Sequence, residues 1–340
     1  MTPFRYERAA TVANALDAGA RPGAAFLAGG TNLVDLMRYG IEAPTALVDI
    51  TRLHLAAVEP LPGGGVRIGA LVRNADLADH PHIRTHFPLL SQALLSGASP
   101  QLRNVATTGG NLLQRTRCYY FNDASFSRCN KRAPGSGCAA IAGRNRIHAI
   151  LGQADRGADS GESCIATHPS DMCVALAALD AAVEIQGMGG TRTVPFAGFH
   201  RLPGATPWID TVLRPGELVV AVTLPPPRFA GNSHYLKARD RRSYAYALVS
   251  VAARLELRDG VVAAAGLALG GVASKPWRVA EAEAALVGRA PGLDGFKEAA
   301  AILLRGARGY AHNGFKVPLA VRCVVRALTL AAAGRRDRPA

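Results

Sequence analysis

The stretch AAFLAGGTNLVDLMRYG, residues 24–40, places an apolar run before two adjacent glycines and a helical pattern after them. Ala24–Leu27 predicts a strand, and Leu33–Tyr39 predicts a helix that ends at Gly40. Strand, glycine pair, hydroxyl and helix start in this order are typical of a phosphate-binding turn, because glycine lets an anion approach the backbone and the first N–H groups of a helix lack partners. The G-x-G-x-x-G spacing of a Rossmann domain is absent, and a plain strand-to-helix turn is the alternative.

A second turn of the same kind stands at Thr107-Thr108-Gly109-Gly110-Asn111. Two further strands are predicted before it, at Ala46–Ile50 and Val66–Ala70. Beyond it, Ser170 predicts the N-cap of a helix that begins at Asp171. Two Gly-Gly turns, each with a neighbouring hydroxyl residue, predict in one domain a clamp that holds the two phosphates of a dinucleotide from both sides. This pairing is more specific than either turn alone.

The run Pro225-Pro226-Pro227 predicts a boundary between two domains, residues 1–226 and residues 229–335. In the second domain, two apolar runs flank Asp259-Gly260, which is a strong hairpin signal. Three helical stretches follow, near Trp277–Val287, Leu293–Leu304 and Pro318–Ala333. A sheet packed against helices follows from this order, so the expected fold class is α+β.

Four cysteines lie in a segment that is rich in Arg and Lys and has little strand or helix pattern: Cys118, Cys129, Cys138 and Cys164, spaced C-x10-C-x8-C-x25-C. A long unstructured loop is uncommon in a compact domain unless it is functional or disordered, and this one carries too many apolar residues for disorder. An iron–sulfur cube held by four thiolates is anionic, so the neighbouring cations would stabilise it. Asp123 is the expected main counter-charge of those cations.

Spacing alone does not identify the metal, because the C-x2-C repeats of zinc ribbons and ferredoxins are absent. Buried thiols or disulfides are the alternatives to a metal site. Cys173 competes with Cys164 for the fourth ligand position, but its place on an apolar helix favours a packed core thiol. Helical spacing assigns Cys323 to the core as well. His148 could replace a cysteine in a zinc site, although we expect it to pack within the loop or lie on the surface.

Composition narrows the class of protein. The 340 residues are 49% hydrophobic with 36 Gly and 21 Pro, as in an ordinary globular chain with many turns. No apolar run reaches the roughly 18 residues that predict a transmembrane helix, and the first residues lack both an apolar core and a twin-Arg pair, so we expect no secretion signal in this sequence. The formal charge of +14 comes from scattered basic residues, which do not form a stripe or a nucleic-acid motif.

Five pieces of sequence, in their order along the chain, resemble the FAD-binding medium subunit of the molybdenum hydroxylases, the family that includes xanthine dehydrogenase, carbon monoxide dehydrogenase and bacterial aldehyde oxidoreductases. The pieces are Phe4-x-Tyr6, Leu27-Ala28-Gly29-Gly30-Thr31-Asn32-Leu33, Thr107-Thr108-Gly109-Gly110-Asn111, Pro169-Ser170-Asp171-Met172 and Tyr235-Leu236-Lys237-Ala238-Arg239. They cover the chain nearly end to end. The resemblance implies a two-part FAD-binding domain and a C-terminal α+β domain with an antiparallel sheet packed against helices.

The resemblance also implies which residues bind FAD. In the family the two Gly-Gly turns hold the pyrophosphate, and the Asp of the Ser-Asp pair and the Lys after the boundary lie against the flavin. Carried over, these roles fall on Leu27, Ala28, Gly29, Gly30, Thr31, Asn32, Leu33, Thr107, Thr108, Gly109, Gly110, Asn111, Asp171 and Lys237. A cation near a flavin stabilises its anionic reduced form, which suits Lys237 and Arg239. Without the resemblance, both would be assigned to a solvated strand end.

Nearly sixty residues separate Asn111 from Ser170, where most family members have roughly ten, an ordinary connection length. Residues 112–168 are therefore expected to be an insertion at the edge of the flavin domain. The insertion resembles one branch of the family, the medium subunits of 4-hydroxybenzoyl-CoA reductase and of the periplasmic aldehyde oxidoreductase, where it carries a [4Fe–4S] cluster. Residues 128–132 and 134–138 are most similar to the aldehyde enzyme. This branch implies a ligand set of Cys118, Cys129, Cys138 and Cys164.

The expected function is electron transfer in a heterotrimer. The resemblance implies that a large subunit oxidises an aldehyde at a molybdenum cofactor, that a small subunit relays electrons through two [2Fe–2S] clusters, and that this chain passes them to an external acceptor. No acid–base pair or nucleophile in the sequence predicts independent catalysis, and His168 belongs to a helix-capping segment.

Two alternatives are a subunit of a 4-hydroxybenzoyl-CoA-reductase-like enzyme and a zinc-stabilised basic nucleic-acid binder that uses Cys118, Cys129, Cys138 and His148. An iron–sulfur site is assembled where thiols stay reduced, so we expect loading in the cytoplasm. The branch implies that the complex then travels to the periplasm on the signal of the small subunit; a cytoplasmic complex is the alternative.

Overall fold

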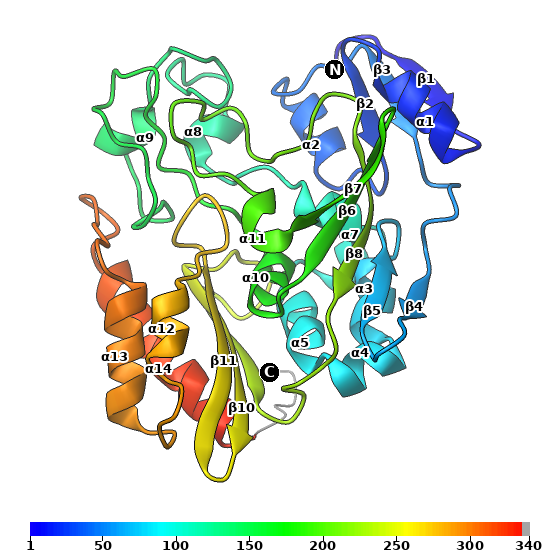
Figure 1. The fold of residues 1–340 in the computed structure, drawn as a ribbon. Coiled ribbons are helices and arrows are strands. Elements are labelled where there is room, and N and C mark those ends of the chain that lie inside the picture. The colour runs from blue at the N-terminus through cyan, green and yellow to red at the C-terminus, as the bar shows by residue number, and fades with distance from the viewer. Residues whose placement is uncertain (335–340) are drawn as a thin grey trace.

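The structure is a computed structural model that describes residues 1–334. Within that range the strands form three separate sheets, which are partly covered by helices (Figure 1). The chain runs from a small N-terminal sheet through a five-stranded sheet to a C-terminal sheet. The end predicted for the second domain, residue 335, lies outside the described residues.

The N-terminal sheet is parallel and has the strand order β1-β3-β2. Its elements in chain order are β1 (Arg5–Arg8), α1 (Val12–Gly19), β2 (Ala24–Leu27), α2 (Leu33–Arg38) and β3 (Ala46–Asp49). Parallel neighbours need a crossover connection, and α1 and α2 supply the helices in these connections. The strand Ala24–Leu27 is confirmed at its predicted bounds, and Asn32 stands at the N-cap of α2.

The middle sheet is antiparallel, with the order β4-β5-β8-β6-β7. Its strands are β4 (Val58–Pro60), β5 (Val66–Gly69), β6 (Ala182–Gly187), β7 (Gly190–Pro195) and β8 (Leu218–Leu224). Between β5 and the insertion lie α3 (Asn74–Asp79), α4 (Pro81–His86), α5 (Pro88–Ser96), α6 (Pro100–Arg103) and α7 (Thr108–Leu112), while α11 (Phe196–Phe199) follows β7. Strand β8, which arrives last in the chain, sits at the centre of this sheet and is buried along most of its length.

The C-terminal sheet is antiparallel, in the order β11-β10-β9, with β9 (Ser233–Ala238), β10 (Val249–Arg258) and β11 (Val261–Gly270). Helices α12 (Ala280–Ala284), α13 (Leu293–Leu303) and α14 (Lys316–Ala332) pack beside it (Figure 1). The hairpin at Asp259-Gly260 is confirmed, because β10 and β11 pair around it and both residues have positive φ, at 50° and 78°.

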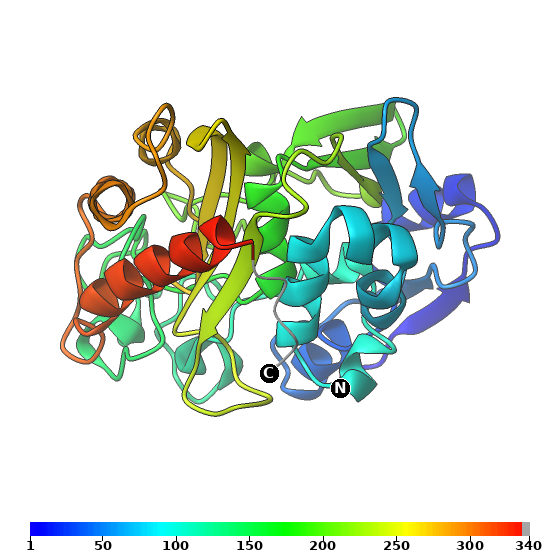
Figure 2. The ribbon, with the colours of Figure 1, turned by 90° about the horizontal axis from the view of Figure 1, so that it is seen from below.

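Helix α10 (Asp171–Ala178) joins the two halves of the molecule. All eight of its residues are buried, and it packs against α5 on one side and against β10 and β11 on the other. Figure 2 shows this green helix between the yellow C-terminal strands and the cyan helices. The predicted N-cap is confirmed, since the Ser170 hydroxyl accepts a hydrogen bond from the Cys173 amide. Residues at the start of α10 are therefore held between two domains.

The insertion, residues 112–168, contains the short helices α8 (Tyr119–Asn122) and α9 (Ala139–Ala142). It packs on the C-terminal domain as well as on the flavin domain. Ile150 and Leu151 belong to the buried core of the C-terminal domain, and both of their amides donate to the Val272 carbonyl, over 2.9 and 3.0 Å. The insertion is thus a link between the two domains and not only an edge of the first one.

One predicted helix is much shorter than expected. The stretch Trp277–Val287 is helical only at α12, because Trp277 exchanges backbone hydrogen bonds with Leu269 at the end of β11. Pairing with the sheet overrides the helical pattern there. Across residues 1–334, every helix falls short of the length and apolar character that a membrane crossing needs.

Candidate functional site

The first Gly-Gly turn presents free backbone donors. Gly30 has a φ of 71°, which favours glycine, and the chain turns there from β2 into α2. Within the part of the chain that the structure describes, the N–H groups of Thr31, Asn32 and Leu33 have no acceptor. The side-chain Nδ2 of Asn32 is also buried without a partner. A row of unpaired N–H groups at a helix start fits a phosphate, so this turn suits the FAD pyrophosphate.

The two Gly-Gly turns are in direct contact. A Cβ placed on Gly29 would lie 2.2 Å from the carbonyl oxygen of Val105, just before the second turn. Asn32 adds a second link, because its Oδ1 accepts from the Arg115 amide over 2.8 Å. Only glycine allows this approach of two backbones. The structure therefore brings together the two turns that the sequence predicts to act as one cradle.

The backbone amides of the second turn already have hydrogen-bond acceptors within the protein. Gly109 donates to the Ala70 carbonyl, Thr108 donates to the Val72 carbonyl, and the Thr107 hydroxyl accepts from Gly110 at the start of α7. The Asn111 amide bonds to the Thr107 carbonyl. These bonds anchor the turn to the end of β5. In this arrangement the free N–H groups come from the first turn, and direct contact of the second turn with a phosphate stays a prediction.

Asp171 and Lys237 form a buried ion pair between α10 and β9. Their side chains are 7% and 4% exposed, and Lys237 Nζ lies 2.8 Å from Asp171 Oδ2. Lys237 also donates to the Ser96 carbonyl at the end of α5, and the Tyr235 hydroxyl donates to Asp171 Oδ1 over 2.7 Å. The pair thus links α10 and α5 of the flavin domain to β9 of the C-terminal domain. Contact of these two residues with FAD stays a prediction.

The four predicted cysteine ligands lie together. Each is 6–8% exposed, and all four belong to one buried cluster, which also contains Tyr120, Phe121 and Ile165. Short backbone bridges shape the site: Cys129 pairs with Cys138, and Cys164 pairs with Ala154. The four side chains also line one small pocket. Residues 46 positions apart at the extremes are therefore brought to one place by folding of the insertion.

The surroundings of the sulfurs suit an anionic cluster. Backbone N–H groups of Phe121, Ala140 and Ala166 act to lower the pKa of Cys118, Cys138 and Cys164, respectively, and so favour the thiolate. Burial and the mutual repulsion of the thiolates nevertheless raise the pKa of Cys138 to about 12, and burial raises the pKa of Cys164. Four thiolates in one buried space need bound cations, and iron in a cluster would supply them.

The spacing of the ligand atoms bears on which metal the four cysteines could hold. Zinc bonds of about 2.3 Å in a tetrahedron would place the sulfurs about 3.8 Å apart. In residues 1–334 no three of the four cysteines, with or without His148, bring their ligand atoms within 4.8 Å of one another. In a cube each thiolate binds a different iron, so the sulfurs stand farther apart. The ligand atoms lie farther apart than a single zinc ion requires, and a [4Fe–4S] cluster on these cysteines stays a prediction.

Cys173 lies elsewhere, with His168 and His200. Their ligand atoms lie within 4.8 Å of one another, and Cys173 is fully buried in the core of the flavin domain. His200 Nε2 donates to the Leu112 carbonyl, whereas His168 Nδ1 accepts from the Ser170 amide. The ring nitrogens left without partners are therefore His200 Nδ1, which carries a lone pair, and His168 Nε2, which carries the hydrogen. A metal ion bound by both rings would need a lone pair on each. This arrangement agrees with the packed core thiol that the sequence favours.

Comparison with known proteins identifies the family. Residues 2–227 match the FAD binding domain in molybdopterin dehydrogenase, and residues 234–331 match the CO dehydrogenase flavoprotein C-terminal domain. The chain belongs to the FAD-binding subunits of the molybdopterin dehydrogenases. It is 52% identical to the aldehyde oxidoreductase FAD-binding subunit PaoB of Escherichia coli K12, over 98% of this chain and 99% of that one.

More distant members agree with this placement. The xanthine dehydrogenase FAD-binding subunit of Escherichia coli O157:H7 is 30% identical over 82% of this chain and 77% of its own. A structure of carbon monoxide dehydrogenase from Hydrogenophaga pseudoflava matches with a TM-score of 0.75 and 25% identity, over 98% of each chain. These relatives are parts of oxidoreductases. The predicted family and fold class are confirmed, and family membership sets aside the nucleic-acid-binding alternative.

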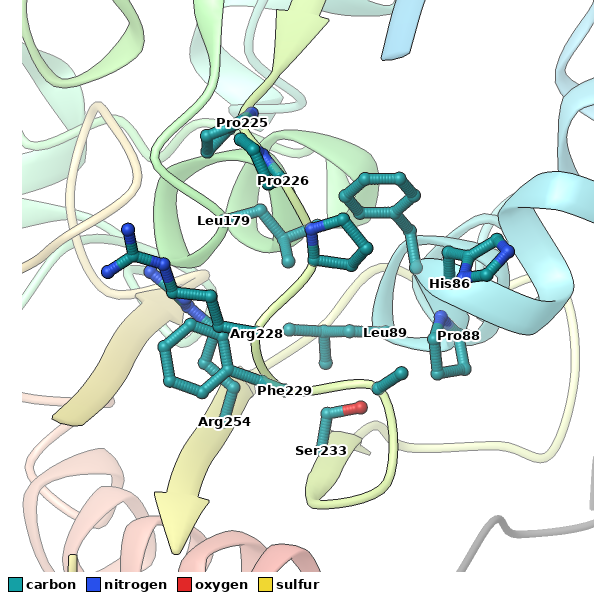
Figure 3. Close-up of a pocket in the computed structure, with 13 residues that line it drawn as sticks. His86, Pro88, Leu89, Leu179, Pro225, Pro226, Arg228, Phe229, Ser233 and Arg254 are labelled. Carbon is teal, nitrogen blue, oxygen red and sulfur yellow. The ribbon is translucent and has the colours of Figure 1, made fainter. Parts of the chain in front are cut away.

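A pocket at the domain linker holds none of the site residues that the sequence predicts. It is lined by Pro225, Pro226 and Pro227 of the linker, by Leu89 at the start of α5 and by residues before and within β9 (Figure 3). Arg254 lies over the ring of Phe229, 3.8 Å from its centre. The Arg254 guanidinium is already paired with Asp180. Because none of the residues predicted to bind FAD lines it, this pocket is not part of the predicted flavin site.

One expectation for the insertion is wrong and another is confirmed. Asp123 is not the main counter-charge, because Arg128, Lys131 and Arg146 form their ion pairs with Asp159, Asp210 and Asp240. His148 packs within the loop, which is one of the two places expected for it: it is 1% exposed, and its ring lies beside Tyr119 and Tyr120. The sequence also offered no signal for the pair of the buried Lys131 with the partly exposed Asp210, whose members are 79 residues apart.

Proposed function

We propose that this chain is the FAD- and [4Fe–4S]-carrying, electron-transferring subunit of a molybdenum-dependent aldehyde oxidoreductase. The observation that carries the proposal is the single buried cluster of four cysteines inside a chain that is 52% identical, along its whole length, to the aldehyde oxidoreductase subunit PaoB. The bound groups supply one-electron and two-electron chemistry that amino-acid side chains lack. The chain's own residues bind, orient and shield these groups.

The FAD would lie on the first Gly-Gly turn. The N–H groups of Thr31, Asn32 and Leu33 would hold its pyrophosphate, and the contact between Gly29 and Val105 fixes the position of this turn. The buried pair Asp171–Lys237 stabilises α10 and β9, the two elements that meet at the domain boundary. These residues position the cofactor, and none is proposed to touch an aldehyde.

The cluster would be held by Cys118, Cys129, Cys138 and Cys164. Lys131 is buried beside them and lowers the pKa of Cys164, although burial outweighs this effect. Arg132 closes the loop, because its guanidinium donates to the carbonyls of Tyr120 and Phe121 over 2.7 and 2.9 Å. A positive setting and a closed loop both stabilise an anionic cluster.

The proposed partners are a large subunit with the molybdenum cofactor and a small subunit with two [2Fe–2S] clusters, and the proposed direction is from these partners to an external acceptor. We further propose that the complex is periplasmic and is exported through the signal of the small subunit. Fractionation of cells that express the whole complex tests this location, and recovery only from the cytoplasm would contradict it.

Iron, sulfide and flavin measured on the purified chain test the proposal. We expect one FAD, four irons and four sulfides per chain. Cys164→Ser should lose most of the iron and keep the FAD, whereas Cys173→Ser should keep both, because Cys173 lies outside the cysteine cluster. A chain that binds zinc in place of iron, or that loses iron with Cys173→Ser alone, would refute the assignment.

The direction of electron flow needs the complex. Aldehyde-dependent reduction of an artificial dye by the purified heterotrimer should be sustained over many turnovers. Electron flow only from a reduced dye toward a thioester substrate would support the 4-hydroxybenzoyl-CoA-reductase-like alternative instead.

A further inference from the structure

We propose that His148 is a positioning residue for the cluster: it donates its Nε2–H to the sulfur of Cys118 and thereby raises the reduction potential. The inference rests on the proposed function, since it requires a cluster on the four cysteines. A reduced cluster carries one more negative charge than an oxidised one, so an N–H dipole aimed at a ligand sulfur stabilises the reduced form more.

The contact between His148 and Cys118 is direct and shielded from solvent. His148 Nε2 lies 3.1 Å from Cys118 Sγ, and the two residues are 1% and 7% exposed. A thiolate bound to iron has no proton to donate. The nitrogen that faces it must therefore carry the hydrogen, because a lone pair in that position would be repelled. With water excluded, such a bond is electrostatically stronger than it would be in solvent.

The other ring nitrogen leaves the proton available for this bond. His148 Nδ1 is buried, and no group among residues 1–334 forms a hydrogen bond with it. A neutral imidazole carries a single N–H. The Asn145 carbonyl interacts with the ring and raises its pKa, against a larger lowering by burial, but it forms no hydrogen bond with Nδ1. The tautomer with the hydrogen on Nε2 is therefore the one that makes a hydrogen bond.

The C-terminal domain holds His148 in place. The His148 carbonyl accepts from Lys316 Nζ over 2.8 Å and from Asn313 Nδ2 over 3.1 Å. Lys316 is fully buried at the start of α14 and also donates to the Gly271 carbonyl. The ring itself packs beside Tyr119 and Tyr120, with centroid distances of 6.3 and 6.2 Å. These contacts restrain both the backbone and the ring of His148 without any contribution from a bound cluster.

This arrangement assigns a function to the packing of the insertion on the C-terminal domain. Lys316 and Asn313 lie 168 and 165 residues from His148 in sequence. They hold the backbone of a residue whose side chain has, within the described residues, a proposed cluster ligand as its only hydrogen-bond partner. The second domain thus contributes to the electronic environment of the cluster as well as to its shape.

The test is a redox titration of the cluster in the full chain, followed by electron paramagnetic resonance at constant pH. His148→Leu removes the donor, and His148→Gln keeps an amide N–H at a position equivalent to Nε2. Tyr119→Phe is the matched control, because it keeps the ring beside His148 and leaves the N–H untouched. Iron and FAD contents are measured on every variant.

We expect the ratio of reduced to oxidised cluster in His148→Leu to fall about tenfold at a fixed potential, which is a negative shift of about 59 mV for one electron. His148→Gln should restore most of it, and Tyr119→Phe should match the parent chain. A His148→Leu variant with full iron and an unchanged potential would overturn the inference. If His148→Leu loses its iron, His148→Gln decides: a parental potential supports the hydrogen bond, and a shifted one refutes it. A parent chain without iron refutes the proposed function itself.

Discussion

Replacing Gly29 with alanine tests the cradle between the two Gly-Gly turns. The new Cβ would lie 2.2 Å from the carbonyl oxygen of Val105 and 2.9 Å from its carbonyl carbon. Ordinary contacts between such atoms are about 3.5 Å, so the two backbones must separate by roughly 1 Å. Neither neighbour is a flexible side-chain end that could turn away. The first turn would therefore move as a unit, together with the free N–H groups of Thr31 and Asn32.

The size of the effect follows from the packing cost. Forcing an extra carbon into a closed contact costs about 1–3 kcal/mol. The turn can relax when it is empty, but FAD needs the native spacing, so this cost falls on binding. A loss of that size weakens affinity about 5-fold to 150-fold, since about 1.4 kcal/mol corresponds to a factor of ten. We expect the Kd for FAD to rise within that range.

The assay is quenching of flavin fluorescence when FAD is added to the deflavinated chain. Gly295→Ala is the matched control, because it makes the same chemical change in α13 where no atom lies within 4 Å of the new Cβ. Iron content and circular dichroism report whether Gly29→Ala still folds. A folded Gly29→Ala chain that binds FAD within twofold of the parent would refute the cradle.

Three further predictions concern the supports of the site. Lys237→Met should destabilise the chain by about 3–5 kcal/mol in urea unfolding, because it leaves Asp171 buried without its cation, and the double variant with Asp171→Asn should recover part of this loss; no recovery would contradict the pair. Ile150→Ala should cost about 2–5 kcal/mol, because Ile150 is fully buried in the C-terminal core, and an unchanged unfolding midpoint would show that the insertion only rests on that domain. Burial lowers the pKa of His200 to about 4, whereas the pKa in the unfolded chain is about 6.5. Between these two values the unfolded chain binds one more proton than the folded chain. The free energy of unfolding should therefore fall by about 3 kcal/mol as the pH drops from 6.5 to 4. His200→Gln keeps a donor for the Leu112 carbonyl without a titrating group, so its unfolding midpoint should depend less on pH over that interval; an equal slope would argue against His200.

Short-range sequence patterns predicted much of the fold. The glycine pair at residues 29–30, the Ser170 cap and the Asp259-Gly260 hairpin each depend on the conformations of a few neighbouring residues, and each is confirmed. The helix predicted at Trp277–Val287 was overestimated because Trp277 bonds to Leu269 in the sheet. Periodicity reports which face of a segment is apolar, but it does not report which strand edge lies within reach of its backbone.

The sequence by itself determined the α+β class, the two Gly-Gly turns and the presence of four cysteines among cations, since these are properties of residue type and short spacing. Only the tertiary structure decided which residues meet. It placed Cys164 with the other three cysteines and Cys173 in another core, it paired Asp171 with Lys237, and it brought His148 against Cys118. The physical reason is that a buried polar group takes its partner from whatever packing brings near it, and in the last two pairs that partner lies 66 and 30 residues away.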